Sequence, residues 1–119
     1  MSWDERGRER PKMNVEKSGC FVFLDDLRDP PLGATLCRTA EAAMSLIESG
    51  AVTRISFDHD LGTELTGYVV AKRVERLVAE GKIVMPRWQV HSANPVGRSN
   101  IEVAMRSAER LANVPLRGE

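Results

Sequence analysis

The sequence predicts an α/β domain built on a parallel sheet, because strand-like and helix-like segments alternate along the chain. The short apolar run over residues 20–24 shows no polar–apolar alternation, which is typical of a strand that is covered on both faces, and residues 52–57 read as a second buried strand. Segments with apolar residues at helical spacing follow these runs. Right-handed crossovers between parallel strands bring the carboxyl ends of the strands to one edge of the sheet, where such folds bind their ligands.

The composition is that of an ordinary globular domain. The 119 residues include 17 basic and 17 acidic side chains, so the formal net charge is zero. This balance gives no reason to expect an extended nucleic-acid surface or a membrane surface as a partner, although local basic groups can still bind a phosphate. We expect one domain over residues 18–119, preceded by a mobile charged tail over residues 1–17.

Cysteine usage and hydropathy favour a cytoplasmic location. Cys20 and Cys37 lack the spacing of a metal or redox pair, and we expect both to be reduced thiols. The sequence has no apolar run of about 18 residues and no apolar segment at its beginning, so we expect neither a membrane span nor a signal peptide.

The first half of the chain is expected to form strand, loop, helix and strand. The strand over residues 20–24 leads into a loop over residues 25–33, which two prolines and a glycine keep irregular. The first helix is expected over residues 38–49, where apolar residues recur on one face, and Gly50 ends it. The second strand is expected over residues 52–57.

The second half repeats the alternation. Thr66 suits the N-cap of the second helix, which ends at a glycine. The third strand is expected over residues 87–91, and residues 83–85 are a candidate for a short additional edge strand. The last helix is expected to begin with a capping box over residues 99–102 and to be ended by Pro115.

Polar, titratable residues follow all three predicted strands at the point where each strand ends. If the strands are parallel, these side chains meet at one edge of the sheet. In chain order they are Asp25 and Asp26, then Asp58, His59 and Asp60, then His91, Ser92 and Asn94.

Four carboxylates at two neighbouring strand ends need a positive partner. Asp25, Asp26, Asp58 and Asp60 would repel one another unless a cation, a proton or an arginine lies among them. Mg²⁺ suits such a site, and we expect Asp25, Asp26 and Asp58 as its ligands. The alternative is that these aspartates only cap turns, which is a common use of the residue.

The only two histidines of the chain, His59 and His91, both fall at these strand ends. One imidazole could deprotonate a water molecule while the other protonates a leaving oxygen, which would open a phosphodiester. With Asp26, Asp58 and Asp60 they form the candidate catalytic group. The alternative is a structural role, in which the imidazoles are hydrogen-bonded to Asp58 or Asp60.

Candidate phosphate-binding residues lie beside this group. Ser92 and Asn94 stand close to the start of the last helix, where free backbone N–H groups favour an anion. Arg28 and Arg98 can hold a phosphate in fork geometry. The alternative is that each arginine is a solvated surface charge.

The motifs at the strand ends resemble the cyclic-phosphate-processing receiver-like domain family. The resemblance rests on FLDDLR over residues 23–28, ISFDHDLG over residues 55–62 and HSANPVGR over residues 91–98, and it extends over about residues 18–110. It implies a small receiver-like, flavodoxin-type parallel sheet of three to five strands with helices packed on it. It also implies that the motif positions are Asp25, Asp26 and Arg28, then Asp58, His59 and Asp60, then His91, Ser92 and Asn94.

The resemblance further implies processing of cyclic phosphates, such as 2′,3′-cyclic phosphate ends of RNA or cyclic nucleotides, in a setting such as RNA repair. We therefore expect a phosphoesterase-like hydrolase that acts on a small phosphorylated ligand or an RNA terminus, and the oligomeric state stays open. The alternatives are a binding module without catalysis and a degenerate response-regulator receiver. A phosphoacceptor receiver needs an acceptor aspartate at an uninterrupted strand end and a lysine late in the sequence. Here His59 interrupts the acceptor end, and no lysine follows Lys82.

Overall fold

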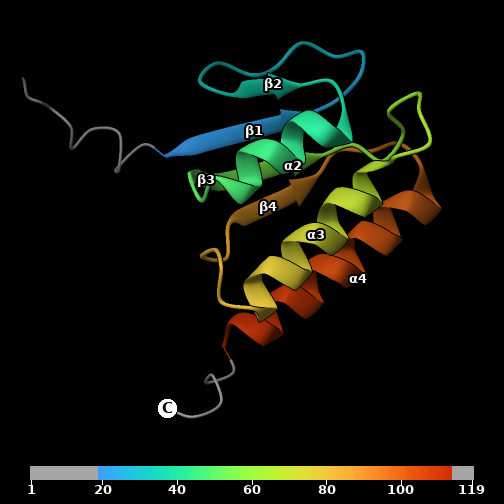
Figure 1. Cartoon of the computed structure of the whole chain (residues 1–119). Helices are drawn as coiled ribbons and strands as arrows, with labels where there is room; N and C mark the ends of the chain where they lie inside the picture. Colours follow the sequence, from blue (N-terminus) through green and yellow to red (C-terminus); the bar gives the residue numbers. More distant parts are fainter. Residues whose placement is uncertain (1–18, 114–119) are drawn as a thin grey trace, which may run out of the picture.

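The computed structural model describes residues 19–113, which form a four-stranded parallel sheet with three helices (Figure 1). The predicted α/β class with a parallel sheet is confirmed. The predicted tail over residues 1–17 lies outside the described residues, as does Pro115. In chain order the elements are β1 (Cys20–Leu24), β2 (Thr35–Cys37), α2 (Ala40–Glu48), β3 (Val52–Phe57), α3 (Gly67–Ala79), β4 (Arg87–Val90) and α4 (Pro95–Ala112).

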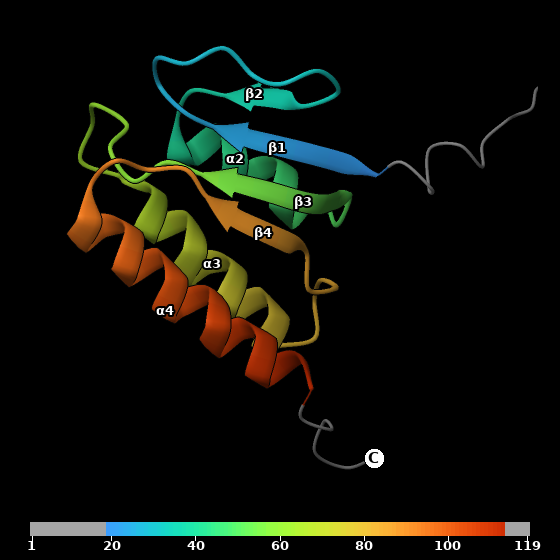
Figure 2. The same cartoon turned by 180° about the vertical axis from the view of Figure 1, so that it is seen from behind.

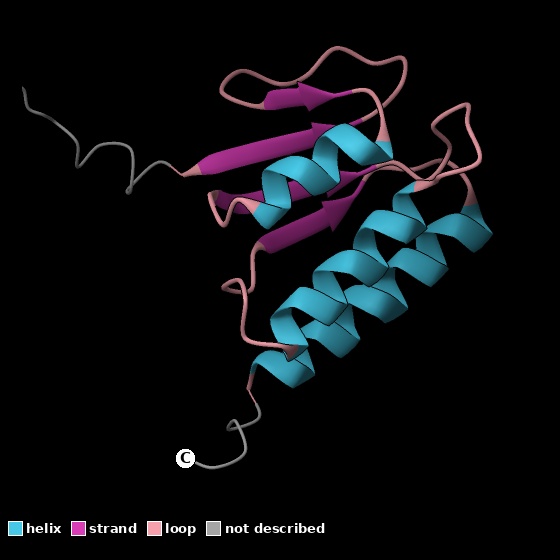
Figure 3. Cartoon of the chain, viewed as in Figure 1, coloured by secondary structure: helices cyan, strands magenta, loops and turns pink. Residues whose placement is uncertain are grey.

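The strand order is β2-β1-β3-β4, and every neighbouring pair is parallel. The arrowheads therefore point toward one edge, where the loops after β1, β3 and β4 lie (Figure 3). The order reverses between β1 and β3, because the chain leaves β1 in one direction and returns to the other side of it. Such a reversal point is where open α/β sheets form their ligand crevices.

One strand was not predicted, and one candidate strand is wrong. No pattern in the sequence predicted β2, because its three residues follow a Pro- and Gly-containing loop and are too few to show a period. Residues 83–85 do not form an edge strand, since they pair with no strand. Ile83 and Met85 are instead packed against the core from the connection between α3 and β4.

The helix starts differ from the predicted ones in one important place. The predicted capping box over residues 99–102 was wrong, because α4 begins at Pro95 and residues 99–102 lie inside the helix. Asn94 is the N-cap, and its side-chain oxygen accepts a hydrogen bond of 3.0 Å from the Gly97 N–H. The fixed φ of a proline suits the first helical position, which explains the earlier start. Thr66 is the N-cap of α3, but its side chain makes no capping hydrogen bond.

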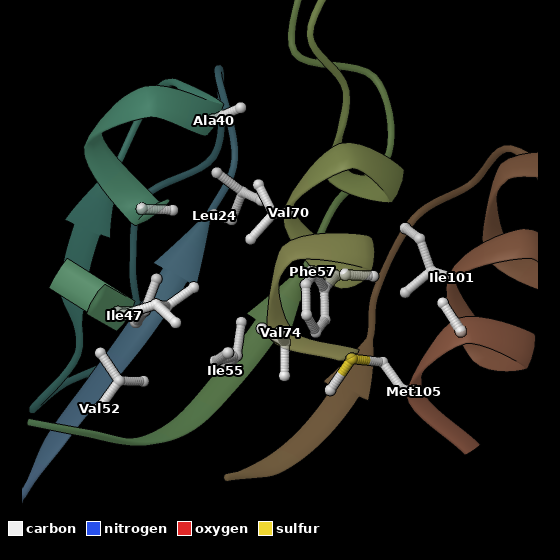
Figure 4. Packing of buried hydrophobic residues seen from close by; sticks show 14 of the residues in the cluster. Leu24, Ala40, Ile47, Val52, Ile55, Phe57, Val70, Val74, Ile101 and Met105 are labelled. Atoms are coloured by element: carbon white, nitrogen blue, oxygen red, sulfur yellow. The ribbon is translucent and has the colours of Figure 1, made fainter. Parts of the chain in front are cut away.

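The core lies between one face of the sheet and the three helices. Leu24 and Phe57 point from the strands toward α3 and α4, where Val70, Ile101 and Met105 pack against them (Figure 4). All five side chains are fully buried. Within residues 19–113, the helices are too short or too polar to cross a lipid bilayer.

The opposite face of the sheet corrects a further expectation. The strand over residues 20–24 was predicted to be covered on both faces, but in Figure 2 the sheet lies in front of α2 and no described helix crosses that face. Residues that alternate with the core positions point to this face. They include Phe21, Phe23, Arg54, Ser56 and Gln89.

Phe57 offers a direct test of the core. We predict that Phe57→Ala lowers the free energy of unfolding by about 3–5 kcal/mol, because it removes a fully buried ring between the sheet and two helices. Urea unfolding followed by circular dichroism measures the change. Leu32→Ala is the matched control: Leu32 is fully exposed, and the variant should stay within about 0.5 kcal/mol of the parent. Similar losses in both variants would contradict this packing.

Candidate functional site

Three polar residues occupy equivalent positions at the ends of three neighbouring strands. Asp25, Asp58 and His91 each follow directly the last residue of β1, β3 or β4, and these last residues are register partners. The sheet ladder continues past the strands: the Asp58 N–H donates to the Leu24 carbonyl at 3.0 Å, and the His91 N–H donates to the Phe57 carbonyl at 2.9 Å. The register therefore sets the three side chains side by side.

These three residues can form a metal site. Each offers one ligand atom, and the three ligand atoms lie within 4.8 Å of one another. Carboxylate oxygens and imidazole nitrogens are ligands of divalent cations in proteins. Of the predicted ligands, Asp25 and Asp58 belong to this group, whereas Asp26 does not, and the third member of the group is His91.

Asp25 is the most constrained member of the group. Its side chain is 1% exposed, and its Oδ1 accepts hydrogen bonds of 2.8 Å from the backbone N–H groups of Leu27 and Arg28. Its Oδ2 lies 2.9 Å from His91 Nε2. Burial raises the pKa of the Asp25 carboxyl, but the hydrogen bonds from Arg28, Leu27 and His91 outweigh it, and the pKa lies below its ordinary value.

His91 is held from three sides. Its Nδ1 lies 2.7 Å from the Ser56 hydroxyl, and its Nε2 faces Asp25. The imidazole stacks on the Phe23 ring, with 4.5 Å between the ring centroids and 3° between the planes. Both ring nitrogens are therefore engaged, and the ring is fixed in its plane.

An open hollow of about 370 Å³ lies over the ends of β1 and β3. It coincides with the reversal point of the strand order, as expected for an α/β sheet. Among the residues in the range 19–113 that line it, Arg28 is the one cation, whereas four are aspartates. The lining consists of Asp25, Asp26, Leu27, Arg28, Asp58, Asp60, Gly62 and Ala93.

His59 lies beside this hollow without belonging to its lining. Its Nδ1 is 2.9 Å from Asp60 Oδ1, and Asn94 Nδ2 donates to the same carboxylate at 3.3 Å. The hydrogen bond from His59, followed by that from Asn94, lowers the pKa of Asp60. The ring packs against α4 at Gly97, where a Cβ would collide with it.

The predicted phosphate-binding residues are spread more widely. Arg28 reaches the rim, where it donates to the His91 carbonyl at 3.1 Å and keeps its side chain 57% exposed. Asn94 caps α4, and the Ser92 hydroxyl accepts from the Asn94 N–H at 3.1 Å, so both shape the turn. Arg98 lies outside the hollow lining and pairs with Glu102 on α4.

Three residues that shape the site were not among the candidate site residues predicted from the sequence. Ser56 and Phe23 hold His91 from the middle of β3 and β1, and Gly67 allows the Asp58 carbonyl to approach the start of α3. Serine within a strand and phenylalanine within an apolar run carry no signal of their own. A strand-to-strand register would have been needed to find them.

The comparisons with known proteins agree with the fold. Residues 20–107 match the model of the family described as Cyclic-phosphate processing Receiver domain. The match confirms the resemblance seen in the motifs and the receiver-like class of the sheet. No curated protein and no solved structure matches the chain.

The hydrogen bonds of the Asp25 carboxylate lead us to expect that the free energy of unfolding depends on pH. Because the folded-state pKa of Asp25 lies below its ordinary value of 3.8, its stabilisation is present above that value and is lost as the pH falls through the folded-state pKa. We predict that Asp25→Asn lowers the free energy of unfolding by about 1.5–3 kcal/mol at neutral pH. The difference should shrink at about pH 3.

Urea unfolding of both proteins across this pH range measures the effect. Asp29→Asn removes an exposed carboxyl from the same loop and serves as the control. A difference between parent and Asp25→Asn that stays constant or grows as the pH falls would contradict the hydrogen-bonded, ionised Asp25.

Proposed function

The chain belongs to the cyclic-phosphate processing receiver domain family, and from this premise we propose that its acidic hollow hydrolyses cyclic phosphodiesters with the help of a divalent cation. The substrate class would be 2′,3′-cyclic phosphate ends of RNA or cyclic nucleotides. A role in RNA repair stays a prediction of the same kind.

The observation that carries the proposal is the alignment of Asp25, Asp58 and His91 beside a hollow lined by four carboxyl groups. A phosphodiester is an anion, and one arginine among four carboxyl groups leaves the hollow with the wrong sign of charge for it. A divalent cation would offset most of this negative charge and offer a positive centre to the phosphate. Two carboxylates together with phosphate oxygens form the usual surroundings of Mg²⁺.

Asp25 and Asp58 are the residues that would hold the cation. Asp25 is ready for this role, because its hydrogen bonds keep the carboxyl ionised and fixed. The Asp58 carboxylate makes no hydrogen bond with another side chain in the described part of the chain and is free to turn toward a ligand. When bound, the cation neutralises phosphate charge and polarises the phosphorus–oxygen bonds.

His59 is the better candidate for proton transfer. Asp60 holds its Nδ1, and its Nε2 forms no hydrogen bond with any residue in the range 19–113. We assign to Nε2 the removal of a proton from water as the water oxygen bonds to phosphorus. The bond from phosphorus to one ribose oxygen breaks, and the imidazolium returns the proton to that oxygen, so that a linear phosphomonoester results.

Arg28 would orient the phosphate. Its guanidinium stands at the rim of the hollow, is more than half exposed and can turn from the His91 carbonyl toward a ligand. Its planar fork can bind two phosphate oxygens at once. Arg38 supports the loop from behind by donating to the Arg28 carbonyl at 3.0 Å.

A second candidate function is binding of a cyclic phosphate without turnover. It is favoured by one observation: both ring nitrogens of His91 are occupied, so a pair of histidines facing each other across a phosphodiester is not available. Phosphotransfer as in a signalling receiver has less support, because none of the lysines that the structure describes lines the hollow. Incubation with cyclic phosphates, with and without EDTA, followed by separation of linear products, distinguishes hydrolysis from binding.

Asp58 tests the cation. We predict that Asp58→Asn weakens Mg²⁺ or Mn²⁺ binding by about tenfold or more and lowers hydrolysis in parallel, because one of two carboxylate ligands is lost. Calorimetric titration and a product assay measure the two effects. Glu64→Gln removes an exposed carboxyl from the loop that follows β3, outside the hollow lining, and should change neither. Hydrolysis that survives EDTA would contradict the cation-dependent mechanism.

The two histidines should behave differently. We predict that His59→Ala lowers kcat by about 10²–10⁴-fold with little change in KM, because the proton-transfer group is removed while substrate contacts remain. His91→Ala should instead weaken cation binding and stability, since the buried Asp25 loses a hydrogen bond. Steady-state kinetics on folded variants separates the two. A greater loss of kcat in His91→Ala, with cation binding intact, would assign proton transfer to His91.

A further inference from the structure

A continuous chain of hydrogen bonds runs from the uncovered face of the sheet to the acidic hollow. Arg54 Nη2 donates to Gln89 Oε1 at 3.1 Å, and Gln89 Nε2 donates to the Ser56 hydroxyl at 3.2 Å. The Ser56 hydroxyl lies 2.7 Å from His91 Nδ1, and His91 Nε2 lies 2.9 Å from Asp25 Oδ2. Four side-chain hydrogen bonds therefore connect five residues of three strands and their ends.

Arg54, at one end of this hydrogen-bond chain, sets the direction of the hydrogen bonds that follow it. An arginine can only donate, so the Gln89 carbonyl oxygen must face Arg54 and the Gln89 amide nitrogen must face Ser56. The Ser56 oxygen accepts from Gln89, and within residues 19–113 its only other hydrogen-bond partner is His91 Nδ1, to which it therefore donates its own proton. A neutral imidazole that accepts at Nδ1 carries its proton on Nε2, from which it donates to Asp25.

Asp25, at the other end of the hydrogen-bond chain, is a suitable acceptor for a chain that runs in this direction. Asp25 is buried, its Oδ1 accepts hydrogen bonds from two backbone N–H groups, and its Oδ2 faces His91, so its carboxylate is the acceptor that an Nε2–H needs. Hydrogen bonds that point the same way polarise one another and strengthen the chain. Ser56 is fully buried, and the Phe23 ring stacks on the imidazole, so neither partner can turn away easily.

The direction of these hydrogen bonds decides whether His91 can bind a metal ion in the proposed cation site, and the inference rests on that proposed function. A metal ligand must offer a lone pair, and the His91 nitrogen that faces Asp25 carries a proton. We propose that Arg54, Gln89 and Ser56 are positioning residues that exclude His91 from direct ligation and so make the site selective for hard, oxygen-bound cations such as Mg²⁺.

The chemistry of the competing ions explains the selectivity. Zn²⁺ favours imidazole nitrogen and would bind tightly to two carboxylates and a histidine. To ligate Zn²⁺ through Nε2, His91 would have to move its proton to Nδ1, and the Ser56 hydroxyl would have to turn from donor to acceptor. Because Gln89 already donates to Ser56, the Ser56 oxygen would then accept two hydrogen bonds, and the proton of the Ser56 hydroxyl would be left without an acceptor. Mg²⁺ needs only the oxygens of Asp25 and Asp58.

Gln89→Glu reverses the chain without disturbing the core, because Gln89 is exposed. The new carboxylate accepts from both Arg54 and Ser56, so the Ser56 oxygen becomes the acceptor for a proton on His91 Nδ1. We expect Nδ1 to be unprotonated in the parent and protonated in Gln89→Glu, as read from the nitrogen-15 spectrum of the imidazole in the full-length protein. The affinity for Zn²⁺ relative to Mg²⁺ should rise by about tenfold or more.

Arg87→Gln is the matched control for charge. It changes the net charge by the same amount as Gln89→Glu, on the same strand and the same face of the sheet, but Arg87 is not part of the hydrogen-bond chain. Its His91 spectrum and its cation preference should equal those of the parent. Equal changes in both variants would attribute the effect to charge alone and overturn the inference.

Two further outcomes are distinguishable. A parent protein that binds Zn²⁺ through His91 Nε2, seen as a shift of that nitrogen, would overturn the inference and leave the cation-dependent proposal intact. A parent protein that binds neither Mg²⁺ nor Zn²⁺ in the hollow would overturn the proposed function itself.

Discussion

The hydrogen bond between His91 and the buried Asp25 carboxylate is the interaction on which the site depends. A carboxylate that is 1% exposed needs partners for both oxygens, and the two backbone N–H groups satisfy only one of them. His91 supplies the other partner from the end of β4, across the intervening strand β3. The contact can form only when three parallel strands are in their observed register, so the stability of the sheet and the geometry of the hollow are coupled.

The same register explains why the site is acidic at its centre. Asp25 and Asp58 follow paired residues, and the loops behind them add Asp26 and Asp60 to one hollow. A divalent cation between Asp25 and Asp58, as we propose, would offset the negative charge that these carboxylates bring together. Membership in a cyclic-phosphate processing family agrees with the proposal that such a cation prepares this hollow for a phosphate.

Much of this arrangement could be predicted from the sequence. The strand-like segments at residues 20–24 and 52–57 end abruptly in aspartates, and alternation of strands with helices requires that these ends share an edge. Local patterns could not reveal β2, because three residues show no period. They also did not give the true start of α4, because residues 99–102 form a plausible capping box although the helix begins after Asn94 at Pro95. The pairing of Ser56 with Gln89 and His91 depends on the register of β3 with β4, which no local pattern encodes.

The most direct test of this account is the position of a bound cation. Crystals grown with Mn²⁺ should give an anomalous peak in the hollow, with oxygen atoms of Asp25 and Asp58 at about 2.0–2.2 Å and His91 Nε2 still directed at Asp25. Absence of any peak between these carboxylates, at a Mn²⁺ concentration that saturates the protein in solution, would contradict the central claim that aligned strand ends form a cation site.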